Sequence, residues 1–171
     1  ITGTGVLVLQ PNSATRAISV GAASTGFDLT LLELASISYS QLVIGRADGA
    51  HAISVASQTL ANATTLRSPN GTIATDGALK ANGALKLVAG SVTIGTGSAL
   101  ASIVVPTSSL EIVTSGPVTI GNDYSEIKAG SAITVTVTGN LTLRGQWTSA
   151  GTLNVSVTGN NLTHNSSNGI E

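Results

Sequence analysis

Short runs in which apolar and polar residues alternate follow one another along almost the whole chain. Typical runs are Ala52-Ile53-Ser54-Val55 and Val118-Thr119-Ile120, in which every second side chain is β-branched. Pairs such as Asp48-Gly49 and Asn82-Gly83 separate the runs, and they supply positive φ angles or side chains that bond their own backbone. Runs of this kind, bounded by turn formers, predict short strands from one end of the chain to the other.

The spacing of recurring sequences predicts how these strands are arranged. Val135-Thr136-Val137-Thr138-Gly139-Asn140 returns 20 residues later with one substitution, and Thr93-Ile94-Gly95 returns after 26 residues. Recurrence at such an interval, with two or three short strands in each repeat, is typical of solenoid proteins. The sequence therefore predicts an all-β fold, a parallel β-helix with coils of roughly 20–26 residues. A β-sandwich is the alternative, because it also contains many short strands.

One segment departs from the strand pattern. Residues 29–36, Leu-Thr-Leu-Leu-Glu-Leu-Ala-Ser, contain good helix formers but are too few to form a stable helix alone. Periodicity does not distinguish a helix from a strand in so short an apolar run. The sequence leaves two alternatives for this segment: a helical turn that lies against a larger structure, or a further strand.

The composition suits the interior of a narrow coil. Hydrophobic residues make up 42% of the 171, but aromatic residues only 2% and charged residues 9%. In a β-helix each side chain stacks on the rung about 4.8 Å away, so small branched residues fit and large rings fit only at ends or corners. A charge repeated at one coil position would face its own copy and destabilise the stack. Low aromatic and charge contents are therefore what stacking requires.

The same figures exclude several classes of function. Seven Lys and Arg residues against eight Asp and Glu residues cannot form the basic stripe that nucleic-acid binding requires. The absence of cysteine excludes a disulfide framework and a thiolate zinc site. The longest apolar runs, such as 6–9 and 102–105, are far shorter than the about 20 residues of a membrane-spanning helix.

The ends of the sequence lack the features of a complete gene product. The chain starts at Ile1 without a methionine or a signal-peptide pattern, and it finishes in a polar run over 163–169. We therefore expect residues 1–171 to form a single β-solenoid module that is a fragment or a processed subunit of a longer secreted protein.

Parts of the chain resemble a known family. The segments 7–11, 16–21 and 43–49, above all Ile44-Gly45-Arg46-Ala47-Asp48-Gly49, resemble repeats of the filamentous-haemagglutinin-like adhesins, which are very large bacterial exoproteins of two-partner secretion. The sequences at 139–143 and 159–163 are similar to the Gly-Asn-Leu-Thr rungs of the same shafts. The resemblance implies a right-handed β-helical shaft, exported across the outer membrane and active in attachment or biofilm. The amino-terminal secretion domain of that family has no counterpart here, which leaves the export route open.

The first candidate site is the segment Gly45-Arg46-Ala47-Asp48-Gly49. Calcium-binding repeats of glycine and aspartate stack many copies, whereas this chain has one. We predict a tight turn in which Asp48 and Gly49 set the backbone and Arg46 pairs with Asp48 or with a neighbouring coil. His51 follows the turn without further ligands at metal spacing, so we predict a turn-exposed polar residue there.

The second candidate site is a loop with two acidic residues, an aromatic ring and a lysine: Asp123, Tyr124, Glu126 and Lys128. Carbohydrate-processing β-helices need clustered carboxylates. The loop is therefore the support for an alternative function, a carbohydrate-binding or polysaccharide-processing β-helix. Two acidic residues in a loop are more often solvated turn residues, and we predict no catalytic residue, no metal and no cofactor.

A third pattern is a row of threonines, Thr134, Thr136 and Thr138, on one strand face. Such a row orders water or ice only where it persists over several coils, and the neighbouring coils do not preserve it. We interpret it as a solvent face with high β-propensity. Binding of ice or another surface through this row is a third hypothesis.

These patterns predict a protein without enzymatic activity, a structural or adhesive extracellular β-solenoid at the surface or in a fibre of a bacterium. A β-helix leaves unpaired strand edges at both ends, and natural solenoids normally cap them. The chain begins with a strand at 6–9 and finishes without a charged or helical cap. We expect its ends to join neighbouring copies or modules stacked end to end, with host or surface glycans as further partners.

Overall fold

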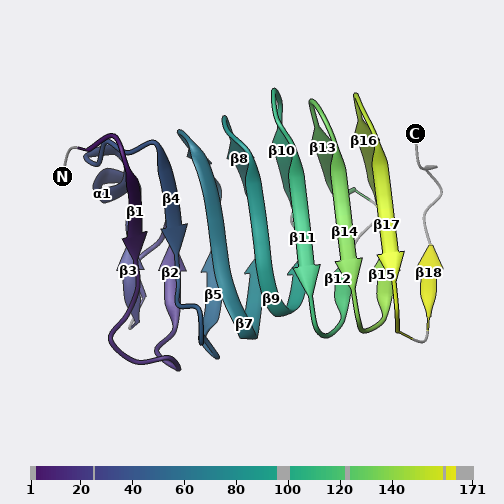
Figure 1. Ribbon diagram of the computed structural model, residues 1–171, viewed down its shortest axis with the longest axis horizontal. Helices are drawn as coiled ribbons and strands as arrows, with labels where there is room; N and C mark the ends of the chain where they lie inside the picture. The colour runs from purple at the N-terminus through teal and green to yellow at the C-terminus, as the bar shows by residue number, and fades with distance from the viewer. Residues whose placement is uncertain (1–2, 25, 96–100, 122–123, 160, 165–171) are drawn as a thin grey trace.

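The computed structural model describes residues 3–164 except 25, 96–100, 122–123 and 160 (Figure 1). Within these residues one short helix accompanies a long series of strands. The elements are β1 (Val6–Leu9), β2 (Ile18–Val20), β3 (Phe27–Leu29), α1 (Leu31–Ala35), β4 (Gln41–Ile44), β5 (Ala52–Val55), β6 (Gln58–Leu60), β7 (Ala63–Thr75), β8 (Ala78–Ala81), β9 (Leu85–Ile94), β10 (Ser102–Val105), β11 (Leu110–Thr114), β12 (Val118–Ile120), β13 (Glu126–Ala129), β14 (Ile133–Val137), β15 (Leu141–Leu143), β16 (Gln146–Ser149), β17 (Leu153–Val157) and β18 (Leu162–His164).

The strands form three faces of a coil, and neighbouring strands on each face are parallel (Figure 1). One sheet of 13 strands bends along β7 and β9, because each of these two long strands crosses from one face to the next. Face A consists of β1, β4, the first parts of β7 and β9, β11, β14 and β17. Face B consists of β3, β2, β5, the second parts of β7 and β9, β12, β15 and β18. Face C is the five-stranded sheet β6-β8-β10-β13-β16.

The register gives the length of each coil. On face A, Thr64 pairs with Leu85, Leu85 with Leu110, Leu110 with Ile133 and Ile133 with Leu153, so successive coils contain 21, 25, 23 and 20 residues. These lengths lie within the interval predicted from the recurring sequences. The prediction of a parallel β-solenoid is confirmed, and the parallel pairing excludes a β-sandwich of antiparallel sheets.

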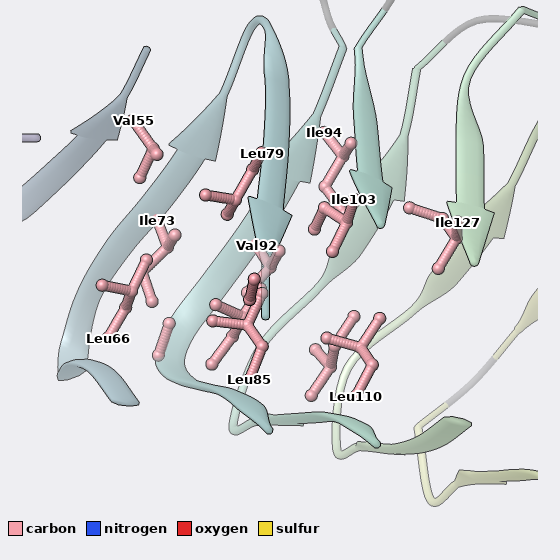
Figure 2. Close-up of a cluster of buried hydrophobic side chains, with 14 of the residues drawn as sticks. Val55, Leu66, Ile73, Leu79, Leu85, Val92, Ile94, Ile103, Leu110 and Ile127 are labelled. Carbon is pink, nitrogen blue, oxygen red and sulfur yellow. The ribbon is translucent and has the colours of Figure 1, made fainter. Parts of the chain in front are cut away.

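Inward-facing side chains form columns that run along the coil. One column on face A consists of Leu66, Leu87, Ile112 and Val135, none of which is more than 1% exposed. Figure 2 shows aliphatic side chains from several coils pointing into a common interior. Full burial of one such side chain stabilises a protein by about 1.5–3 kcal/mol. These columns therefore provide the main stabilisation of the coil, and rings are not needed to fill it.

A file of glycines forms the corner between faces A and B. Its members, in successive coils, are Gly71, Gly90, Gly116, Gly139 and Gly159. A Cβ atom at each of the last four would contact the backbone of the glycine one coil before it. At Gly139, for example, it would lie 2.5 Å from the carbonyl carbon of Gly116. The coils meet at this corner through backbone atoms, which explains why each corner sequence begins with glycine.

The N-terminal end of the coil is closed by α1 and β3. The hydroxyl of Thr30 accepts a hydrogen bond from the backbone N–H of Glu33, and the Glu33 carboxylate accepts one from the Thr30 N–H, which forms a capping box. The helical alternative for this segment is thus confirmed over Leu31–Ala35. Leu34 packs on the core, and the helix lies against β6 where the first coil has no strand on face C.

The large rings that are buried or half-buried lie at the two ends, as expected for a narrow interior. Phe27 belongs to β3, the outermost strand of face B at the N-terminal end, and Tyr39 is buried next to α1. Trp147 belongs to β16, the last strand of face C, and is 1% exposed. Rings therefore close the column ends, while Val, Ile and Leu fill the coils between them.

Candidate functional site

The segment Gly45-Arg46-Ala47-Asp48-Gly49 forms the turn that follows β4 on face A. Gly45 has a φ of 102°, which favours glycine, and a Cβ atom there would contact the carbonyl oxygen of Arg67 in the next coil. At Gly49 a Cβ atom would lie 2.5 Å from Cε1 of the His51 ring. Both glycines are therefore needed for the close packing of this turn against its neighbours.

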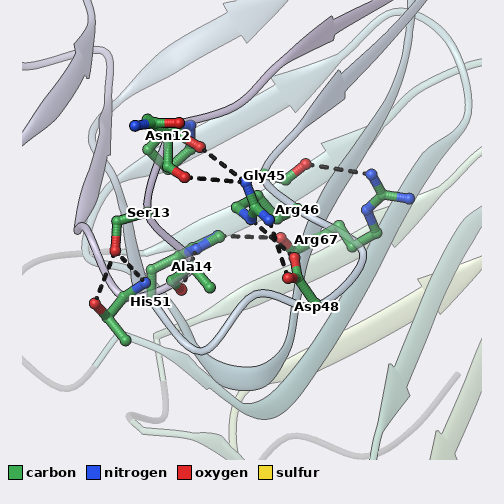
Figure 3. A network of polar contacts seen from close by, with 10 residues as sticks. Asn12, Ser13, Ala14, Gly45, Arg46, Asp48, His51 and Arg67 are labelled. Carbon is green, nitrogen blue, oxygen red and sulfur yellow. Dashed lines mark hydrogen bonds and ion pairs between the residues drawn. The ribbon is translucent and has the colours of Figure 1, made fainter.

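Arg46 and Asp48 form a bidentate ion pair within this turn (Figure 3). The Arg46 Nε lies 2.8 Å from Oδ1 of Asp48, and Nη2 lies 3.0 Å from Oδ2. The Arg46 Nη1 donates a further hydrogen bond of 3.2 Å to the carbonyl oxygen of Asn12 in the preceding coil. The guanidinium holds the pKa of the Asp48 carboxyl below its usual value, chiefly through these hydrogen bonds. The pair thus orients Arg46 toward the backbone of the coil before it.

His51 is fully buried, so the prediction of a turn-exposed residue is wrong. Its Nδ1 lies 3.0 Å from the carbonyl oxygen of Ala14, and its Nε2 lies 3.2 Å from the carbonyl oxygen of Arg67 (Figure 3). Ala14 belongs to the coil before His51 and Arg67 to the coil after it. The ring therefore contacts the backbone of the coil before it and of the coil after it, and so bridges three coils.

We call these residues, Arg46, Asp48 and His51 with their partners, the polar clamp. Ser68 extends it, since its hydroxyl donates a hydrogen bond of 2.5 Å to the His51 carbonyl oxygen. The Arg67 Nη2 donates one of 3.3 Å to the Gly45 carbonyl oxygen. Most of these bonds join a side chain to the backbone of another coil. This arrangement suits holding coils together and leaves the His51 ring no access to a substrate.

The described residues of the second candidate loop lie in β13 of face C or directly before it. Asp123 lies outside the described residues. Tyr124 is 79% exposed just before β13, and Glu126 and Lys128 point outward from β13 on either side of the buried Ile127. Glu126 lies opposite Ser102 and Gln146 of the adjacent strands. The structure therefore brings one acidic, one basic and one aromatic side chain to one outer surface, without a second carboxylate among the register neighbours of Glu126.

The threonine row on β14 does not continue into the neighbouring coils. Thr134 lies between Glu111 and Asn154, and Thr136 lies between Val113 and Ser156. A different file runs across the coils on face B, where Thr93, Thr119, Thr142 and Thr163 pair one after another. The sequence analysis did not detect it, although the recurring Gly-x-Val-Thr and Gly-x-Leu-Thr tetrapeptides at 90–93, 116–119 and 139–142 carried the signal.

Three surface hollows lie among the described residues and have volumes of about 190, 180 and 160 Å³. Sites for small organic ligands usually measure about 300–1,000 Å³. None of the three includes a residue of the polar clamp or of the Tyr124 surface. Across the described part of the chain, no three His, Cys, Asp or Glu side chains are grouped as a metal site would require.

No family model, curated protein or solved structure matches the chain. Among the residues that the structure describes, no helix is long and apolar enough to span a lipid bilayer.

Proposed function

We propose that the chain is a structural, non-catalytic rod unit of a secreted bacterial adhesin or fibre, joined to neighbouring modules. The observation that carries this proposal is the unbroken stacking of inward columns on all three faces. Successive coils contribute aliphatic inward residues, and a glycine corner recurs from Gly71 to Gly159. A body of this kind resists bending because its backbone hydrogen bonds lie along the rod axis.

The polar clamp supports the same role. Through Arg46 and His51 it joins the first three coils, at the N-terminal end of the rod. The resemblance of segments 43–49 and 139–143 to adhesin shaft repeats agrees with a place at the bacterial surface. The lack of cysteine and methionine also suits an extracellular protein, because it removes the side chains that are most readily oxidised.

The experiment is to locate the protein and measure what its display does. Antibodies against the chain are expected to label extracellular fibres of the source cells in electron micrographs. Display of the chain on a non-adherent bacterium is expected to raise attachment to surfaces. Display of an unfolded variant such as Ile112→Asp is the control for fold dependence. Label confined to the cell interior, or equal attachment with both proteins, would count against the proposal.

The exposed Tyr124 favours one second candidate, contact with a carbohydrate. An exposed ring beside Glu126 and Lys128 offers a stacking surface flanked by hydrogen-bonding groups. Binding of an immobilised uronate polysaccharide that is lost in Tyr124→Ala and kept in Thr148→Ala, on the next strand of the same face, would support this candidate. Equal binding by both variants would exclude the Tyr124 surface as its site.

A further inference from the structure

A small hollow lies between α1 and β6, at the N-terminal end of face C. Its volume is about 160 Å³, and an apolar cavity of about 150 Å³ is large enough to hold one benzene molecule. Leu31 in the lining is 50% exposed, whereas Leu60 is 1% exposed, so the hollow leads from the surface toward the interior. It therefore has room for one edge of a six-membered ring that enters from outside.

The lining combines apolar side chains, an aromatic ring and uncharged polar groups. It includes Leu31, Leu34, Tyr39, Gln58, Thr59 and Leu60. Among the described residues that line the hollow, none is Asp, Glu, Lys, Arg or His. Ligand sites in proteins are mostly apolar and aromatic, with a few polar groups that orient the ligand. The hollow therefore suits a neutral ligand, whereas the Tyr124 surface carries two charged groups.

Gln58 departs from the pattern of the inward residues on face C. It faces inward on β6, and the residues in register with it in the following coils are Leu79, Ile103 and Ile127. Gln58 is 7% exposed, and neither Oε1 nor Nε2 of its carboxamide has a hydrogen-bond partner among the described residues. Gly21 lies beside this carboxamide, but its N–H already donates to the carbonyl oxygen of Leu29 at 2.8 Å. A buried amide without partners lowers stability, and proteins break packing rules of this kind mainly at functional sites.

We propose that this hollow binds a neutral sugar through two neighbouring hydroxyl groups of the sugar ring. A buried carboxamide needs an acceptor for its N–H groups and a donor for its oxygen. Since every hydroxyl can both donate and accept, two neighbouring hydroxyls supply both bonds to Gln58 at once. The ring carbons between them then contact the leucines and Tyr39. The proposal rests on the proposed function, because it names the chemical class that the adhesive unit binds.

The test is a titration of the ¹⁵N-labelled 171-residue chain with methyl β-D-glucopyranoside, followed by NMR. The side-chain amide signals of Gln58, identified by their loss in Gln58→Leu, are expected to shift with a dissociation constant of about 1–10 mM. The 3-deoxy derivative of this glucoside has no hydroxyl groups on neighbouring ring carbons. It is expected to bind at least about tenfold more weakly, because the two hydrogen bonds cannot form together.

Two glutamine variants serve as a matched pair. Gln58→Leu places on β6 the residue type that Leu79 has in the next coil, so circular dichroism is expected to keep the β-sheet spectrum. In this variant the glucoside is expected to leave the backbone amide signal of Leu60 unshifted. Gln146→Leu makes the same change at an exposed position of β16 on the same face, and it is expected to bind as the wild type does.

Three results would overturn the inference. Equal shifts with the glucoside and its 3-deoxy derivative would show that neighbouring hydroxyls are not recognised. No shift with either would show that the carboxamide holds a buried water only. Binding of acetamide without binding of the glucoside would show a site for an amide and not for a sugar. None of these results bears on the rod function, since that function is tested by the location and attachment of the displayed chain.

Discussion

The substitution Gly139→Ala tests whether the glycine corner is set by contact between coils. Gly139 does not have a positive φ, so alanine meets no conformational penalty there. Its Cβ atom would instead lie 2.5 Å from the carbonyl carbon of Gly116, 2.7 Å from the nitrogen of Pro117 and 2.8 Å from the oxygen of Gly116. All three are backbone atoms, which cannot rotate away as a side chain can. One coil must therefore move relative to the next by several tenths of an ångström or more.

The cost follows from the contacts that this movement disturbs. Overpacking of a close-packed interior costs about 1–3 kcal/mol. The adjacent bonds from the N–H of Thr138 to the oxygen of Thr114, 3.1 Å, and from the N–H of Val118 to the oxygen of Asn140, 2.9 Å, would lengthen, at a cost of about 1 kcal/mol for each bond lost. Alanine also lowers the entropy of the unfolded chain, which offsets about 0.4–1 kcal/mol of this loss in the free energy of unfolding. We expect a net loss of about 2–4 kcal/mol in the free energy of unfolding.

Urea denaturation followed by circular dichroism measures this loss. With a slope of about 2 kcal/mol/M, the midpoint is expected to fall by about 1–2 M without a change of slope. The matched control is Gly5→Ala, because a Cβ atom at Gly5 would have no heavy atom within 4 Å. If Gly139→Ala shifts the midpoint no more than Gly5→Ala does, the coils do not meet through backbone contact at this corner, and the reasoning is refuted.

Three further predictions concern the polar clamp and the buried indole. His51→Ala leaves the carbonyl groups of Ala14 and Arg67 without their side-chain partner, and is expected to cost about 2–5 kcal/mol in urea denaturation, whereas Val8→Ala on the exposed side of β1 is expected to stay within about 0.5 kcal/mol; equal effects would contradict a bridging role. Because Arg46 lowers the folded-state pKa of Asp48 from about 3.8, the stabilisation is present above that value and is lost as pH falls through the lowered pKa. Asp48→Asn is therefore expected to reduce the fall of the urea midpoint between about pH 6 and about pH 3, and an unchanged fall would argue against the pair. Trp147 has a buried Nε1 without a hydrogen-bond partner among the described residues. Trp147→Phe is therefore expected to change the free energy of unfolding by less than about 1.5 kcal/mol, whereas Ile127→Ala in the same column is expected to lower it by about 2–5 kcal/mol. A large loss in Trp147→Phe would show that the indole N–H has a hydrogen-bond partner.

Much of the coil could be predicted because the sequence pattern that specifies its strands and turns is local and recurs along the chain. Alternation with a period of two marks inward and outward residues in a strand, and Asn-Gly or Asp-Gly pairs mark turns. The recurrence of Val135-Thr136-Val137-Thr138-Gly139-Asn140 after 20 residues then indicated the length of a coil. The sequence did not decide between a helix and a strand at Leu31–Ala35. The helix is stabilised by lying against β6, and local propensity does not contain that contact.

The environment of His51 could not be predicted from its neighbours in sequence. A histidine three residues after an Asp at a turn is usually exposed. Here the carbonyl groups of Ala14 and Arg67 approach it from coils that are 37 and 16 residues away along the chain. The threonine file on face B was missed for the same reason, since pairing across coils and not spacing along a strand brings Thr93, Thr119 and Thr142 together.

The sequence by itself indicated the class of this protein: an aliphatic chain with 9% charged residues and a repeat of about 20 residues favours burial of its apolar side chains by stacking one coil on the next. The tertiary structure decided what happens between coils and at the ends. Which glycines meet the backbone of the coil before them, and which side chains bridge three coils, depends on register. That β3 and α1 close the N-terminal end while Val155 and Leu162 stay exposed depends on which strand lies outermost, a relation between distant segments that no local pattern records.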